Sequence, residues 1–254
     1  MELNIIISPK EITIQETLMF QTDDQSLFWK TQLFEVYPFL NKEKGLYPSW
    51  HKRKEYLRKE LSKIYDDEQK TFHSQLKVYL HQWETNKKAL TEIFSNIFNI
   101  DCSCLFNQMT AQISLNPICP RYLNTQTFSV FYKFGPKQFL NMVIHEVTHF
   151  IWFYVWQQSF YDDKAEYDQP HLKWLLSEMV IDTLIKNTKL STLYAQEDLD
   201  KPAYEYFYNI KIQNTALLDA LKKIYLNSPN IQIFMKQAYQ YLQINETPIR
   251  KQIP

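Results

Sequence analysis

The residues of this chain best suited to chemistry are His145, Glu146 and His149, in the segment His-Glu-Val-Thr-His. Histidines four residues apart lie one turn apart on the same face of a helix, so both imidazoles can bind one metal ion. Glu146 can reach water on that ion without being a ligand itself. Zinc lowers the pKa of bound water toward ~7 and polarises a carbonyl, while a carboxylate takes the proton. The spacing therefore predicts a zinc site suited to hydrolysis.

The sequence around the motif supports this prediction. Residues 139–156 are strongly apolar and directly follow a predicted strand. Two histidines and a glutamate are costly to bury in such a segment without a function. They also argue against a membrane span, because a charged residue at the centre of a spanning helix costs roughly 2.5 to 3.5 kcal/mol. We therefore expect a buried helix that carries polar chemistry.

A catalytic zinc usually has three protein ligands and one open position, so a third ligand is expected. The metzincin continuation would need glycine at 152 and histidine at 155, where this chain has Trp152 and Val155, and that class is excluded. Downstream, the best candidate is Glu178, on a second apolar helix. Asp182 follows one turn later and could accept the other ring N–H of a ligand histidine.

Three other residues are alternatives for the third ligand: His171, Asp182 and Glu166. His171 lies two turns before Glu178, roughly 10 Å by helical rise, which is too far for both to bind one ion. His171 could instead contact the substrate or the transition state, or it could be a surface histidine near a helix N-terminus.

These positions resemble the gluzincin metallopeptidases, in which H-E-x-x-H on one helix is completed by a glutamate in an E-x-x-x-D segment on a later helix. By that resemblance, His145, His149 and Glu178 would bind one zinc ion. Glu146 would be the general base, and Asp182 would support a ligand histidine.

The resemblance covers roughly residues 110–190 and implies a zincin-like domain with a peptide or protein substrate. An extended peptide would lie along an edge strand at Thr127 to Phe134. Twenty-eight residues separate His149 from Glu178, somewhat more than in the best-known members of the group.

A peptidase of this kind also needs a donor for the oxyanion of the tetrahedral intermediate. The candidates are Tyr204, Tyr206 and Tyr208, together with His171. The alternative is that these alternating tyrosines are half-buried packing residues, since a buried tyrosine commonly keeps a partner for its hydroxyl.

Hydrophobic periodicity predicts an α+β, predominantly helical chain. Short strands are expected at Leu3 to Ile7 and Ile12 to Ile14. A helix with Ser49 as N-cap carries Trp50, Leu57, Leu61 and Ile64; separate helices carry Phe72 to Trp83 and Leu90 to Ile97. His73 and His81, on these helices, are expected at the surface.

The period changes to two before the motif. Ala111, Ile113 and Leu115 alternate with polar residues, and residues 127–134 are rich in strand formers, so a small antiparallel sheet is expected to precede the motif helix. Pro136 suits the first turn of that helix. Further helices are expected from Pro170 to Lys186 and after an N-cap at Ser228.

The composition sets limits on partners and location. Lysine and arginine total 28, as do aspartate and glutamate, so no global field favours nucleic acid or a membrane surface. With two glycines, phosphate-binding glycine loops are excluded. No secretory signal is apparent, which makes the cytoplasm the expected location. The three cysteines are expected to be buried thiols, with a second metal site as the minor alternative.

Together these features predict a single domain over residues 1–254, with an N-terminal part (1–105), a metal-site core (106–190) and a C-terminal helical part (191–254). The expected activity is that of a zinc metallopeptidase using Glu-assisted activation of a zinc-bound water. The rival hypothesis is a non-catalytic regulatory or binding protein with a structural metal site, in which the fourth coordination position is closed.

Overall fold

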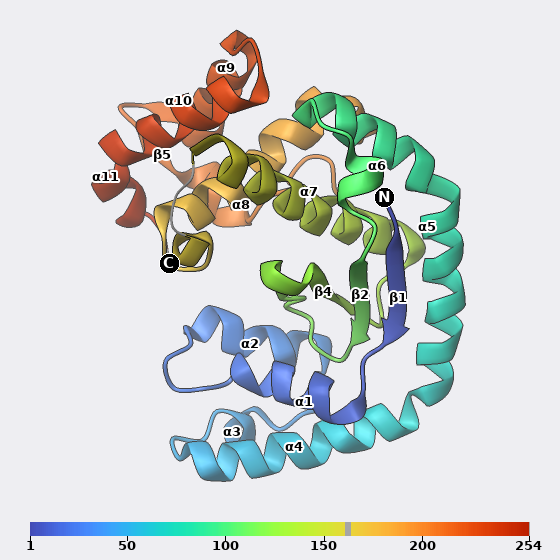
Figure 1. Ribbon diagram of the computed structural model, residues 1–254. Helices are drawn as coiled ribbons and strands as arrows, with labels where there is room; N and C mark the ends of the chain where they lie inside the picture. The colour runs from blue at the N-terminus through green and yellow to red at the C-terminus, as the bar shows by residue number, and fades with distance from the viewer. Residues whose placement is uncertain (161–163, 254) are drawn as a thin grey trace. The chain divides into compact units, whose positions relative to one another are not determined.

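Helices make up most of the computed structural model, which describes residues 1–160 and 164–253 (Figure 1). The α+β, mainly helical class is confirmed. Contacts divide the chain into two compact units. One contains Met1, Asn86–Phe106 and Leu140–Pro254, and the other contains Glu2–Thr85 and Asn107–Phe139. Each unit combines segments that are distant along the chain.

The second unit contains a four-stranded sheet in the order β1-β2-β4-β3. Its strands are β1 (Leu3–Ile7), β2 (Met109–Ser114), β3 (Arg121–Tyr122) and β4 (Thr127–Phe131). β1, β2 and β4 lie side by side and run parallel (Figure 1). β3 pairs with β4 in the antiparallel direction. The expected antiparallel sheet is therefore wrong. The chain between β2 and β4 is long enough to return to the start of the sheet, which a tight hairpin turn would not allow.

β4 is also not the open edge that was expected for residues 127–134. β2 pairs with one side of it, and β3 pairs with the other side at Thr127 and Phe128. The backbone N–H of Ser129 donates to the carbonyl of Pro120 (2.9 Å), so this outer side of β4 is also hydrogen-bonded at Ser129. The part of β4 from Thr127 to Ser129 therefore cannot add a peptide strand along its outer side.

The helices of this unit are α1 (Lys10–Met19), α2 (Leu27–Val36), α3 (Lys42–Gly45), α4 (Trp50–Asp67) and the first part of α5 (Gln69–Phe98). α4 begins after Ser49, as expected. The strand expected at Ile12 to Ile14 is wrong, because those residues lie in α1. The two helices expected between residues 72 and 97 form the single helix α5. His73 and His81 are exposed on it, as expected.

A buried carboxylate joins α1 to the sheet. Glu16 accepts hydrogen bonds from Ser129 (2.7 Å), Ser114 (2.9 Å) and the Tyr122 hydroxyl (3.1 Å). Burial raises the pKa of Glu16 above its usual value, although the three hydroxyl donors oppose that shift. Glu16 thus connects α1 with three strands at the cost of desolvating an ionisable group.

The other unit is almost entirely helical. Its longer helices are most of α7 (Pro136–Phe160), α8 (Leu172–Asn187), α9 (Leu217–Asn227) and α10 (Ile231–Ile244). The shorter elements are α6 (Cys102–Leu105), η2 (Lys164–Tyr167), η3 (Lys189–Thr192), η4 (Glu205–Asn209), β5 (Lys211–Ile212), β6 (Thr215–Ala216) and α11 (Glu246–Arg250). α7 begins at Pro136, as predicted.

The predicted helix starts on the C-terminal side need small corrections. α8 begins at Leu172, two residues after the predicted Pro170. The N-cap expected at Ser228 is wrong, because Asn230 caps α10 by accepting from the Ile233 N–H (2.9 Å). Asparagine and serine are comparably good N-caps, so the sequence alone does not choose between them.

α7 is apolar on nearly every face because it lies inside its unit. On one side, Trp152 packs against Phe234 of α10 (ring centroids 6.0 Å apart), and Trp156 packs edge-on against Tyr239 (5.3 Å). None of the helices formed by residues 1–160 and 164–253 has the length and apolar character needed to cross a membrane. The cysteines are free thiols; Cys102 and Cys119 are buried as expected, whereas Cys104 is exposed.

Candidate metal centre

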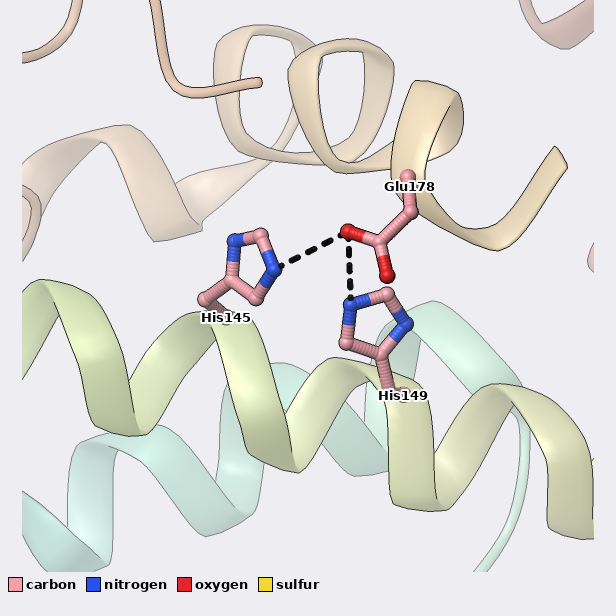
Figure 2. A group of neighbouring side chains, drawn as sticks. All are labelled: His145, His149 and Glu178. Carbon is pink, nitrogen blue, oxygen red and sulfur yellow. Dashed lines mark ion pairs between the residues drawn. The ribbon is translucent and has the colours of Figure 1, made fainter. Parts of the chain in front are cut away.

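Two helices bring His145, His149 and Glu178 together (Figure 2). The histidines stand one turn apart on α7, and Glu178 reaches toward them from α8 (Figure 2). Glu178 Oε2 lies 3.3 Å from His145 Nε2 and 3.5 Å from His149 Nε2. One candidate ligand atom from each residue lies within 4.8 Å of the other two. The three side chains can therefore converge on one ion.

The donor types and their burial fit a metal cation. The side chains of His149 and Glu178 are 0% and 1% exposed, whereas that of His145 is 18% exposed. Withdrawing a carboxylate from water is costly unless positive charge or hydrogen-bond donors balance it. Two imidazole nitrogens with one carboxylate oxygen form a ligand set that zinc accepts. His145 gives the group a partly open side.

Glu146 lies beside this group without belonging to it. Its Oε1 atom is 3.9 Å from His145 Nε2, and its side chain is buried. Consecutive residues of a helix point about 100° apart, so Glu146 leaves α7 to one side of His145. A carboxylate in this place can exchange a proton with a molecule held at the group.

Asp182 lies one turn after Glu178 on α8. It accepts a hydrogen bond from the Tyr208 hydroxyl (2.7 Å) and pairs with Lys186 (2.6 Å). These partners of Asp182 are a phenol and an ammonium group. The expected hydrogen bond from a ligand histidine to Asp182 stays a prediction.

The other candidates for the third ligand lie elsewhere. His171 is the exposed N-cap residue of α8, and its side chain makes no capping hydrogen bond. Glu166, in η2, forms an ion pair with Lys173. Over the described ranges 1–160 and 164–253, the group of ligand-type side chains contains Glu178 and none of the three alternatives, and no second such group involves the cysteines.

The three candidate tyrosines have different surroundings. Tyr204 and Tyr206 stack with ring centroids 5.5 Å apart, while the hydroxyl of Tyr208 is bonded to Asp182. Burial, followed by the negative charge of Glu178, raises the pKa of Tyr206 above its usual value. Of the three tyrosines, Tyr206 is the one whose raised pKa includes a contribution from the charge of Glu178.

Sequence reasoning missed Asn141. This residue lies one turn before His145 on α7 and is buried. Its side chain bonds to Asp198 and to the backbone of Ala195. The available signal was that Asn141 is a polar residue of an apolar helix, spaced four residues before His145. Its partner Asp198 is 57 residues away along the chain, so the sequence did not indicate what Asn141 contacts.

No family model matches the chain, and searches of the curated proteins and of the solved structures give no significant match. The function is therefore inferred from the residues of the site themselves.

Proposed function

We propose that this protein is a zinc-dependent metallopeptidase of the gluzincin type, built on a zincin-like domain. The observation that carries the proposal is the meeting of His145 and His149 with Glu178, with Glu146 beside them. In sequence, Glu146 stands between the two histidines in His-Glu-Val-Thr-His. Three ligands and one neighbouring carboxylate suit hydrolysis more than storage of an ion.

The two histidines and Glu178 would hold the zinc ion. When bound, zinc supplies Lewis acidity, which lowers the pKa of water and polarises a carbonyl group. Glu146 would take one proton from the attacking water as the new C–O bond forms. It would then deliver that proton to the leaving amine nitrogen as the C–N bond breaks. Water is consumed, a carboxylic acid and an amine are released, which ionise to a carboxylate and an ammonium group at neutral pH, and Glu146 returns to its starting state.

The proposal also needs a hydrogen-bond donor to the oxyanion of the tetrahedral intermediate, and the candidates are Tyr204, Tyr206 and Tyr208. The hydroxyl of Tyr208 is already bonded to Asp182, whereas the charge of Glu178 contributes, after burial, to the raised pKa of Tyr206. One donor to an oxyanion is worth about 100- to 1,000-fold in rate. We therefore assign Tyr206 that role in the proposal.

The rival, a structural metal site, is less well supported. Structural zinc sites usually have four protein ligands, whereas three ligand-type side chains meet here among the described residues. The partly exposed side chain of His145 leaves a side on which a substrate can approach.

The test is hydrolysis of a complex peptide mixture by the zinc-loaded protein, followed by mass spectrometry, with Glu146→Gln as the paired variant. We expect new peptide termini with the wild type and a loss of at least about 100-fold with Glu146→Gln, because an amide cannot accept the proton. Both proteins should carry equal zinc. Equal cleavage by the two proteins would remove Glu146 as the base, and no cleavage by zinc-loaded wild type would favour the structural-site rival.

A further inference from the structure

The segment that follows η3 is fastened to α7 close to the metal group. We define residues 195–209 as the tethered segment. Asn141 Nδ2 donates to Asp198 Oδ2 (2.6 Å), and the Ala195 N–H donates to Asn141 Oδ1 (2.9 Å). Asn141 thus uses both ends of its buried amide to hold the start of the segment. It does so one helical turn before the ligand His145.

We call the two hydrogen bonds of Asn141 the first tie. A second tie, formed by the hydrogen bonds and the ion pair described next, joins the same segment to α8. The Tyr208 hydroxyl donates to Asp182 Oδ1 (2.7 Å) and accepts from the Ala203 N–H (3.2 Å). Lys186 Nζ bridges Asp182 Oδ1 (2.6 Å) and the carbonyl of Asp200 (2.6 Å). Asp182, one turn after the ligand Glu178, is therefore connected to the later part of the segment directly through Tyr208 and indirectly through Lys186.

The two ties have the same relation to the metal group. Each starts from a buried polar side chain one turn from a ligand, and each ends on the tethered segment. Tyr206 lies in the segment after both the first tie and Ala203, next to the buried Phe207, and its pKa responds to the charge of Glu178. Because residues on both sides of Tyr206 are bonded to α7 or α8, a displacement of either helix would also displace the part of the segment that carries Tyr206.

We propose that Asn141 and Asp182 are positioning residues that hold the tethered segment, and with it the Tyr206 phenol, in fixed register with His145 and Glu178. This inference rests on the proposed peptidase function for its kinetic part. Its structural part, a segment locked by hydrogen bonds to both helices, is measurable without any reaction. The first tie is best suited to a test because its two side chains can be exchanged.

The exchange uses Asn141→Asp, Asp198→Asn and the double variant. In Asn141→Asp, the new carboxylate at position 141 cannot donate to Asp198, so that hydrogen bond is lost. The two carboxylates also repel each other, which moves the start of the segment away from α7 and weakens the remaining bond from the Ala195 N–H. In the double variant, the new amide at position 198 can donate to the carboxylate at position 141. That carboxylate can also accept from the Ala195 N–H, so the tie is restored with donor and acceptor reversed. Loss of a charge-assisted hydrogen bond of about 1.5 to 3 kcal/mol corresponds to roughly 10- to 100-fold.

The first readout is amide hydrogen exchange of zinc-loaded protein. We expect the Ala195 amide to exchange about 10- to 100-fold faster in Asn141→Asp, with bound zinc unchanged, and to regain protection in the double variant. Glu205→Gln is the matched control, because the ion pair of Glu205 with Lys201 lies within the segment itself. Unchanged exchange in Asn141→Asp, or no recovery in the double variant, would overturn the tie.

The second readout is kcat on a peptide cleaved by the wild type. We expect Asn141→Asp to lower kcat more than it raises KM, the double variant to recover it, and Asn141→Asp to add little to Tyr206→Phe. Wild-type kcat in Asn141→Asp would overturn the positioning role while the peptidase proposal stands. A zinc-loaded wild type without activity would refute the peptidase proposal and the kinetic part with it, leaving hydrogen exchange to decide the tie. If Asn141→Asp does not fold, Tyr208→Phe tests the second tie in the same way at the Ala203 amide.

Discussion

Adding zinc to metal-free protein is expected to raise its melting temperature by an amount that depends on His149. By the proposal, the ion would bind His145, His149 and Glu178 as the fold brings them together, and an unfolded chain does not hold Glu178 beside the two histidines. At free zinc of 100 times the Kd, binding stabilises the folded state by ~2.7 kcal/mol. For a chain of this size each kcal/mol moves the melting temperature by roughly 2 to 4 °C, so the expected rise is about 5 to 11 °C.

Thermal unfolding followed with and without buffered zinc measures this shift for each variant separately. His149→Ala removes a ligand whose side chain is fully buried, so its own melting temperature falls because of the cavity. That cost is present with and without zinc and cancels in the zinc-induced difference. We expect the difference to disappear in His149→Ala. Glu146→Gln is the matched control, because Glu146 is not a ligand and the full shift should remain.

Two outcomes would refute this reasoning. A shift in His149→Ala as large as that of the wild type would place the bound ion elsewhere, for example at exposed histidines. Loss of the shift in Glu146→Gln would mean that Glu146 binds the ion directly, whereas the group of three ligand-type side chains does not include it.

Two further predictions concern the sheet-containing unit. Because burial raises the pKa of Glu16, its protonated form is favoured in the folded state; its contribution to stability is greatest below about pH 4.5 and is lost as pH rises through the folded pKa. Chemical unfolding across pH should show this decline in the wild type and not in Glu16→Gln, and identical pH profiles would refute it. Gly45→Ala would place a Cβ 2.3 Å from Phe34 Cζ, so unfolding should show a loss of about 1 to 3 kcal/mol. Gly135→Ala, whose nearest neighbour is 3.8 Å away, should change stability little, and equal losses in the two variants would contradict the packing argument.

The motif helix was predictable because its signals are local. The spacing of His145 and His149, the apolar residues around them and Pro136 at the helix start all act within one segment. Glu178 was proposed as the third ligand because it lies on a second apolar helix with Asp182 one turn later, and the resemblance to gluzincins agreed with that choice. Its placement depends on how α8 packs on α7, which a single sequence does not encode in any short pattern.

The errors in the sheet and in the helices have physical causes. Alternation identifies a strand, but not the direction of its partner, so β2 and β4 were expected to be antiparallel. The triplet Ile12-Thr13-Ile14 imitates strand alternation, yet adjacent Thr13 and Ile14 are both buried, as a helix after Pro9 allows. No glycine or proline interrupts residues 84–89, so the two expected helices continue as one.

The ties of the tethered segment could not be predicted at all. The partners Asn141 and Asp198 are 57 residues apart, and Asp182 and Tyr208 are 26 apart. Hydrogen bonds of this kind are set by tertiary packing and leave no periodic pattern.

The zinc content of purified variants tests the central assignment most directly. Elemental analysis should find about one zinc per chain in the wild type and in His171→Ala, because His171 is exposed and lies outside the ligand group. Glu178→Ala should lose zinc about as completely as His149→Ala, since each change leaves two protein ligands. Asp182→Ala should retain zinc with affinity weakened by at most about 10- to 100-fold. Retention of zinc by Glu178→Ala together with its loss from His171→Ala would contradict the assignment and indicate a site of three histidines.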